Sequence, residues 1–232
     1  MAKYNRVIIK ISGEALSTNK FGIQNPAVEV VAKQIKSVVD KGVEVGVVVG
    51  GGNFWRGRTS QSMDRAKADY IGMLATVMNG VALGEALSAI GIDNHVVSSL
   101  AIDKVCETFF LPNVLNYLNN KQVVIFVGGT GNPYFSTDSA ASLRACEVHA
   151  DAILCAKAVD GIYDSDPGSN PHAKKYDEIS YDKVIADNLK AMDLTSIAMC
   201  REYGVKLVVF SKDEPNGLAR VVDGEKLGTI VK

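Results

Sequence analysis

The chain has 232 residues, of which 47% are hydrophobic and 22% charged, and its formal net charge is −1. That length can bury one sizeable core, whereas the near-neutral charge, with no Lys/Arg run longer than two residues, argues against a broad nucleic-acid-binding surface. The four cysteines are widely separated and only three histidines are present, so the sequence contains no zinc-binding pattern and we expect reduced, buried thiols.

The chain begins with a predicted strand, helix and strand. Residues 6–11, RVIIKI, form the first predicted strand. Asn25 and Pro26 supply the N-cap and first position of a helix with an apolar stripe, and Gly42 closes it. Residues 43–49 form a strand that is apolar on both faces, which is typical of a parallel sheet covered on both sides.

A long helix is predicted over residues 63–89, and alternation of strands and helices continues after it. The helix is apolar on more than one face and rich in Gly and Ala, which lower helix propensity unless close packing compensates. The elements predicted after it are a strand near Val96, a helix from Pro112, strand 123–127, helix 137–149, strand 152–156, helices 181–189 and 193–203, strand 206–210 and a strand near Thr229. This order predicts an α/β fold, a three-layer α/β/α sandwich with a mainly parallel central sheet, as one domain over residues 1–232.

Three predicted strands end in glycine or small polar residues, at residues 12–13, 50–52 and 128–131. Ligands of open α/β sheets bind at the carboxyl ends of the strands. Glycine lets backbone N–H groups approach an anion, and a helix N-terminus adds a favourable dipole. Any one such turn could be purely structural, but three on one sheet favour a phosphate site. The P-loop and dinucleotide-binding motifs are absent.

Lys10 lies inside the apolar first strand, where an unpaired ammonium would be costly. Its partner is either a structural carboxylate or a polyphosphate, and the residues alone leave both open. Arg56 follows the triple glycine, and Asp138 stands at the start of a predicted helix.

Six segments together resemble the bacterial UMP kinase family of the amino-acid kinase superfamily. They are KISGEAL (10–16), GGGNFWRG (50–57), ADYIGMLATVMNG (68–80), GTGNPYFSTDSAA (129–141), VDGIYDSDP (159–167) and MDLTS (192–196), in order along essentially the whole chain. The resemblance implies transfer of the ATP γ-phosphoryl group to UMP, giving UDP and ADP, with Mg²⁺ as cofactor.

The resemblance also implies a role for particular residues on the ATP side. Lys10 and Arg56 would neutralise phosphate charge. Asp138 would orient Lys10 or hold the metal, unless it is an ordinary helix N-cap, and Asp193 would support the same site. Mg²⁺ would otherwise be held mainly by the nucleotide phosphates. The implied catalytic residues are Lys10, Arg56, Asp138 and Asp193, and the implied ATP-binding residues are Lys10, Ile11, Ser12, Gly13, Gly52, Arg56, Lys157, Tyr163 and Asp166. Lys157 is a placeholder, because the family usually has Thr or Asn near this point.

On the UMP side, the resemblance implies that Asp69 accepts from the ribose and that the loop 130–137 wraps the nucleotide. Thr137 is the first choice for contact with the base edge. The implied UMP-binding residues are Gly51, Asp69, Thr130, Gly131, Asn132, Pro133, Tyr134, Phe135, Ser136 and Thr137.

Regulation and assembly are implied in the same way: activation by GTP, inhibition by UTP and a homohexamer arranged as a trimer of dimers. Residues 17–22 stand where the GTP-linked loop would be, although an exposed hairpin explains them equally well. Small residues of the long helix, Gly72, Ala75 and Gly80, suit close packing either against a symmetry mate or inside the monomer.

The amino-terminal apolar run is too short for a signal peptide, and no segment is expected to span a bilayer, so we expect a cytoplasmic protein. Two other functions stay open. One is a related kinase that makes an acyl or carbamoyl phosphate, and the other is a non-catalytic uridylate sensor.

Overall fold

The structure is a computed structural model that describes residues 2–18, 21–56 and 63–232. Asn19 and Lys20 of the predicted GTP-linked segment, and Gly57 of the glycine motif, lie outside the described residues. The elements in chain order are β1 (Arg6–Ile11), the 3-10 helix η1 (Gly13–Leu16), α1 (Asn25–Val39), β2 (Glu44–Val49), α2 (Arg65–Ala89), β3 (Asn94–Ser98), β4 (Glu107–Thr108), α3 (Leu111–Asn119), β5 (Val123–Val127), α4 (Thr137–Glu147), β6 (Ala152–Lys157), β7 (Ile162–Tyr163), β8 (Lys175–Tyr176), β9 (Glu178–Ile179), α5 (Tyr181–Ala186), α6 (Leu194–Tyr203), β10 (Lys206–Ser211), α7 (Gly217–Val222) and β11 (Gly228–Val231).

Within the described residues, nine strands form one sheet in the order β4-β3-β5-β2-β1-β6-β10-β11-β9. All neighbouring pairs are parallel except β10 with β11. β1 lies at the centre, with β2 on one side and β6 on the other, so the strand order changes direction there. The carboxyl ends of β1, β2 and their neighbours therefore form the crevice in which α/β sheets bind ligands.

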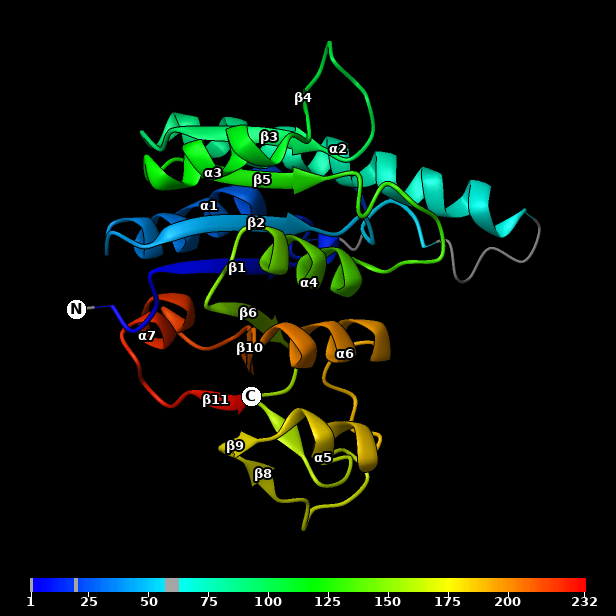
Figure 1. Cartoon of the computed structure of the whole chain (residues 1–232), viewed down its shortest axis with the longest axis vertical. Coiled ribbons are helices and arrows are strands. Elements are labelled where there is room, and N and C mark those ends of the chain that lie inside the picture. The colour runs from blue at the N-terminus through cyan, green and yellow to red at the C-terminus, as the bar shows by residue number, and fades with distance from the viewer. Residues whose placement is uncertain (1, 19–20, 57–62) are drawn as a thin grey trace.

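Helices cover both faces of the sheet, which confirms the predicted three-layer α/β/α architecture (Figure 1). One core cluster joins α1, α2 and α7 to one face of the sheet, and the other joins α3, α4, α5 and α6 to the opposite face. β2 and β5 are almost fully buried along their length, as expected for parallel strands packed on both sides.

The predicted elements are all present, with boundaries shifted by a few residues. The N-cap of α1 is Gln24 instead of Asn25, and Asp193 lies just outside α6 as its N-cap. The elements that the sequence did not indicate are η1, α7 and the two-residue strands β4, β7, β8 and β9. Two-residue strands are too short to show a period, and α7 has only six residues.

The expectation that no segment could span a bilayer is wrong for α2 on length and composition. This helix has 25 residues and a mean hydropathy of 1.3 over its most apolar stretch, half of which is buried inside the molecule. A buried core helix meets the same criteria, so α2 is weak evidence for a membrane.

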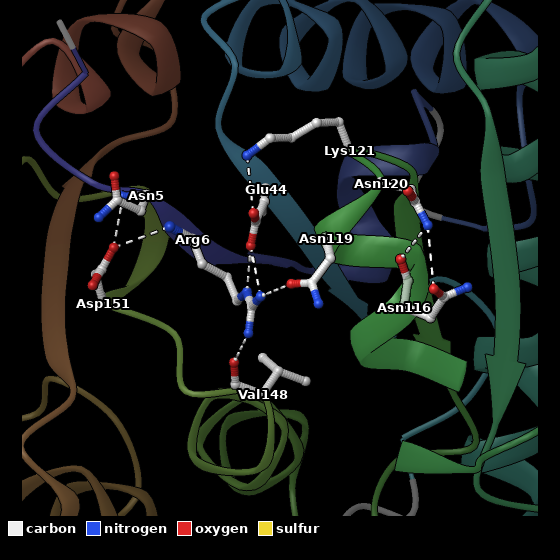
Figure 2. Close-up of polar contacts among 9 residues, drawn as sticks. All are labelled: Asn5, Arg6, Glu44, Asn116, Asn119, Asn120, Lys121, Val148 and Asp151. Carbon is white, nitrogen blue, oxygen red and sulfur yellow. Dashed lines mark hydrogen bonds and ion pairs between the residues drawn. The ribbon is translucent and has the colours of Figure 1, made fainter. Parts of the chain in front are cut away.

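A polar cluster lies at the amino ends of the central strands β1, β2 and β6, opposite the crevice at their carboxyl ends (Figure 2). The guanidinium of Arg6, at the start of β1, pairs with Glu44 at 2.7 Å and donates to the backbone oxygen of Val148 and to Asn119 Oδ1. Asp151 accepts from the backbone N–H groups of Asn5 and Arg6 at 2.6 and 3.0 Å. Because Asn119 and Val148 stand at the C-terminal ends of α3 and α4, the Arg6 charge also complements two helix dipoles.

Candidate active site

A cavity of about 470 Å³, cavity 1, opens at the carboxyl ends of the central strands. Its lining brings together residues from β1, the glycine turn after β2, the first half of α2 and the loop after β5. The predicted site residues that line cavity 1 are Lys10, Ser12, Gly13, Gly51, Gly52, Arg56, Asp69, Thr130, Asn132, Phe135, Ser136 and Thr137. Gly131, Pro133 and Tyr134 belong to the same loop without lining the cavity.

Lys10, which lines cavity 1, forms an ion pair with Asp138, with Nζ 2.8 Å from Oδ1, whereas Asp138 itself lines neither cavity. Both side chains are mostly buried, at 16% and 19% exposure. Burial opposes the charge on Lys10, but the neighbouring Cys155, Asp138 and Asp193 together outweigh burial, so the pKa of Lys10 is raised. Burial also raises the pKa of Cys155, which leaves the carboxylates of Asp138 and Asp193 as the anions that keep Lys10 charged.

Asp138 is not the N-cap of α4. That position belongs to Ser136, whose hydroxyl accepts from the backbone N–H groups of Asp138 and Ser139 at 3.0 and 3.3 Å. Asp138 Oδ1 is buried and, among the described residues, has no hydrogen bond in addition to the ion pair. The Asp138 carboxylate is thus free to orient the Lys10 ammonium.

Asp193 ties the start of α6 to the start of α4. It accepts from the backbone N–H and hydroxyl of Ser196, both at 2.8 Å, and from the hydroxyls of Ser139 at 3.1 Å and Ser136. Burial would raise the pKa of Asp193, but these donors lower it overall. Asp193 therefore supports the helix that carries Asp138 and lines neither cavity itself.

The glycine turn after β2 is packed against both β1 and α2. A Cβ on Gly13 would lie 2.7 Å from the Gly50 oxygen, and one on Gly51 would lie 2.6 Å from the Gly72 oxygen. Beneath the turn, Asn79 donates to the Gly50 oxygen at 2.7 Å from a fully buried position. These close approaches explain why the turn requires glycine.

On the α2 side, Asp69 holds two neighbours. Its carboxylate pairs with Arg65 Nε, with both oxygens at 2.9 Å, and accepts from the backbone N–H of Tyr134 at 2.8 Å. Asp69 thus fixes the loop 130–137 to α2. Arg65 was not among the predicted site residues, although its position four residues before Asp69 on a helix is a recognisable signal.

The loop after β5 begins with a left-handed glycine turn. Gly128, Gly129 and Gly131 have φ of +75°, +58° and +79°, and the Gly128 N–H donates to Thr76 Oγ1 at 2.7 Å. At the other end of the loop, Thr137 Oγ1 lies against Gly50, so Thr137 stands at the Lys10 end of cavity 1.

Two side chains next to the glycine turn after β2 bear on anion binding. Arg56 pairs with Glu14, and both side chains are more than half exposed. Trp55 lines cavity 1, and its Nε1 is buried without a hydrogen-bond partner among the described residues. A buried donor of this kind is suited to an acceptor oxygen of a ligand. The sequence analysis assigned no role to Glu14, Trp55 or Thr76.

A second cavity of about 550 Å³, cavity 2, shares Lys10, Ser12 and Glu14 with cavity 1. The predicted ATP-binding residue Ile11 lines it, together with apolar side chains of α1 and α7. Lys10 therefore stands where two cavities meet.

The other predicted ATP-side residues, Lys157, Tyr163 and Asp166, line neither cavity. Lys157 donates to the Ala191 backbone oxygen. The Tyr163 hydroxyl donates to Asp160 at 2.7 Å, and Asp166 accepts from the backbone N–H of Gly168 at 2.9 Å.

No three His, Cys, Asp or Glu side chains come together as a metal-binding group within the part of the chain that the structure describes. Mg²⁺ commonly uses one or two carboxylates together with substrate phosphates. Asp138, whose buried Oδ1 accepts no other hydrogen bond, fits such a partial ligand set.

Comparisons with known proteins give one consistent result. Residues 5–211 match the family model described as the amino acid kinase family. A UMP kinase from Bacillus anthracis is 37% identical and superposes with a TM-score of 0.95, covering 99% of this chain and 96% of its own. A UMP kinase from Ureaplasma parvum is 40% identical with a TM-score of 0.94, covering 99% of each chain. A uridylate kinase from Archaeoglobus fulgidus is 26% identical with a TM-score of 0.74, covering all of both chains.

Proposed function

Because this chain belongs to the amino acid kinase family, we propose that it is a UMP kinase, which transfers the γ-phosphoryl group of ATP to UMP and forms ADP and UDP. The observation that carries the proposal is the position of Lys10 between two cavities, held charged by Asp138. The similarity to UMP kinases from two bacteria over 99% of the chain supports the choice of acceptor.

Phosphoryl transfer requires two nucleotides in line and neutralisation of charge on the transferred group. Lys10 is the cation at the junction, and its raised pKa keeps it charged at neutral pH. The backbone N–H groups of Ser12 and Gly13, with Gly52 and Arg56, would bind the ATP phosphates. Asp138 orients Lys10, and Asp193 holds the helix start that carries Asp138.

UMP would occupy cavity 1, between α2 and the loop 130–137. Asp69 is fixed by Arg65 and by the Tyr134 N–H, which leaves its carboxylate aligned to accept from a ribose hydroxyl. Gly51 and the loop residues would surround the phosphate and base. On the ATP side, the proposed contacts with the adenosine part of ATP are Lys157, Tyr163 and Asp166.

Mg²⁺ would be held mainly by the nucleotide phosphates, with the Asp138 carboxylate as a candidate protein ligand. When bound, it would neutralise phosphate charge during transfer.

The whole chain would act as one domain, because both cores pack on the same sheet. Its proposed location is the cytoplasm. A homohexamer built as a trimer of dimers is supported by a stripe of exposed apolar side chains along α2, namely Tyr70, Ile71, Leu74, Met78 and Val81. Two of the small residues of α2 do not supply that support, since a Cβ on Gly80 would meet Val127 and Ile125 inside the monomer and Ala75 is buried there.

Regulation by nucleotides is also proposed. UTP would inhibit by placing its uridylate part in cavity 1 and its extra phosphates towards Lys10. GTP would activate, and a titration with GTP at subsaturating ATP tests this, because a flat response would remove GTP from the proposal.

The proposed reaction is tested by offering ATP with UMP, aspartate, glutamate or carbamate in separate incubations. We expect ADP release only with UMP, and UDP as the second product by ³¹P NMR. ADP release only with a carboxylate or carbamate acceptor would favour the acyl or carbamoyl phosphate alternative and overturn the assignment.

A further inference from the structure

Arg144 is a buried cation in the last turn of α4, at 4% exposure. Its guanidinium carbon lies 3.9 Å from the centroid of the Phe109 ring and 5.8 Å from that of Phe126. Glu147, one turn along the helix, pairs with it. A charge in such an apolar setting carries a large desolvation cost, which hydrogen bonds to the guanidinium must offset.

The second terminal nitrogen of Arg144 donates to Ser99 Oγ at 2.8 Å, and Ser99 Oγ lies 2.8 Å from the Gly129 backbone oxygen. The donor and acceptor in each of these two hydrogen bonds follow from the chemistry of the groups. A guanidinium has donors only, so the hydroxyl oxygen must accept from Arg144, and its single hydrogen is left for the Gly129 carbonyl. The charge of Arg144 strengthens that second bond by polarising the hydroxyl.

Gly129 is part of the left-handed turn that opens the loop 130–137. Ser99 lies directly under the turn: its backbone N–H donates to the Val127 oxygen at 3.0 Å, and a Cβ on Gly131 would lie 3.1 Å from the Ser99 oxygen. The turn is thus held by Thr76 of α2 through Gly128, and by Arg144 of α4 through Ser99.

We infer that Arg144, acting through Ser99, is a positioning residue for the loop that binds the acceptor nucleotide, an inference that rests on the proposed function. Gly129 and Thr130 line cavity 1 and not cavity 2. Loss of the Arg144–Ser99–Gly129 chain therefore loosens acceptor binding and leaves ATP binding unchanged.

The test compares Ser99→Ala, Arg144→Met and the double variant with the wild type, measuring KM for UMP and for ATP separately. Each single variant is expected to raise KM for UMP about tenfold, the factor that corresponds to one hydrogen bond to a charged group. KM for ATP stays within about twofold, and the double variant is no worse than Arg144→Met, because both changes break one chain of contacts.

A purely structural role predicts a different result, since loss of folded enzyme lowers the maximal rate and leaves both KM values unchanged. Arg6→Met is the matched control, because Arg6 also pairs with a glutamate in a mostly buried position (Figure 2). Arg6 lies at the amino end of β1, away from the cavities at the carboxyl ends of the strands. Arg6→Met is expected to lower the melting temperature without changing KM for UMP. Unchanged KM for UMP in both Ser99→Ala and Arg144→Met overturns the inference.

Amide hydrogen exchange separates this inference from the proposed reaction. If the wild type does not phosphorylate UMP, the proposed function fails, and exchange at residues 128–132 decides on the positioning role alone. Faster exchange there in Ser99→Ala, with residues 10–13 unchanged, supports it. Equal exchange in wild type and variant contradicts it.

Discussion

At the scale of single residues, Lys10 pairs with Asp138 at 2.8 Å and lies at the junction of two cavities. That a lysine in an apolar strand has a partner could be predicted from the sequence, but whether the partner is a carboxylate or a polyphosphate could not. Arg144 and Ser99 were beyond prediction, because their contact joins residues 45 positions apart.

The hydroxyl groups of the loop 130–137 are the candidate contacts for the uracil base. Among the loop hydroxyls, Ser136 is used by Asp193 and the α4 cap, and Thr137 stands beside Gly50 at the Lys10 end. The Tyr134 hydroxyl is a poorer candidate, because Tyr134 does not line cavity 1. That leaves Thr130, whose hydroxyl contacts Asn132 of its own loop and no other described residue, as the hydroxyl best placed for the base.

Uracil and cytosine present opposite donor and acceptor groups at two positions, and each unpaired buried polar group costs about 1–3 kcal/mol. We expect the wild type to favour UMP over CMP by about a hundredfold or more in kcat/KM. Thr130→Ala should reduce this ratio, whereas Thr137→Ala should lower kcat for both nucleotides at a constant ratio. A ratio that falls only in Thr137→Ala would return the base contact to Thr137, as the sequence analysis proposed.

Asp193 predicts a pH dependence of stability. Hydrogen bonds lower its pKa below the ordinary value of 3.8, so its contribution is complete above that pH and is lost as the pH falls through the folded-state pKa. Asp193→Asn should therefore lower the free energy of unfolding by about 1–3 kcal/mol near neutral pH, with a smaller difference below pH 3.8.

Urea unfolding of both proteins from pH 3 to 7, at one fixed protein concentration, measures this difference. A gap between wild type and Asp193→Asn that does not depend on pH would show that the charge of Asp193 contributes nothing.

At the scale of elements, the strands and long helices could be predicted because their apolar periods are long enough to detect. The short strands β7, β8 and β9 and helix α7 lack such a period, and they are held by partners distant in sequence, as β9 is by β11. The glycines of α2 were recognised as signs of close packing, but the sequence left open what they pack against. Gly80 and Gly84 face β3 and β5 of the same chain.

Gly80→Ala should therefore destabilise the fold, since its Cβ would overlap Val127 Cγ1. Overpacking of this kind costs about 1–3 kcal/mol. Gly72→Ala is the matched control on the same helix, because among the described residues its Cβ would meet Trp55 alone, at 3.9 Å. It should be neutral or stabilising through helix propensity. Equal midpoints for the two variants in urea would contradict the packing account.

At the scale of the whole molecule, α2 carries a stripe of exposed apolar side chains that no contact within the described residues of one chain covers. The stripe consists of Tyr70, Ile71, Leu74, Met78 and Val81. These residues recur at helical spacing on α2 and are 36% to 50% exposed. No comparable side-chain pattern could be recognised from the sequence, because α2 is apolar on more than one face. The fold itself decides which face stays outside.

Light scattering of the wild type should give a mass near six times the 24.8 kDa of one chain. Leu74→Glu should lower that mass by placing a charge in the buried subunit contact. Val30→Glu is the matched control, since Val30 is an exposed apolar residue of α1 outside the stripe. A wild type that stays monomeric on concentration would defeat the proposed assembly.

Lys10→Ala tests most directly whether phosphoryl transfer occurs at Lys10, where cavities 1 and 2 meet. The affinity for UMP is measured by calorimetry, and turnover is measured with ATP and UMP. Removal of one preorganised charge-stabilising group lowers kcat by about a hundredfold to a thousandfold, while the Kd for UMP should stay within about threefold because Asp69 and the loop 130–137 remain. Lys183→Ala, an exposed lysine of α5 paired with Asp187, should leave both values unchanged. Full turnover in Lys10→Ala would contradict the account and favour a site that binds uridylate without Lys10-dependent chemistry.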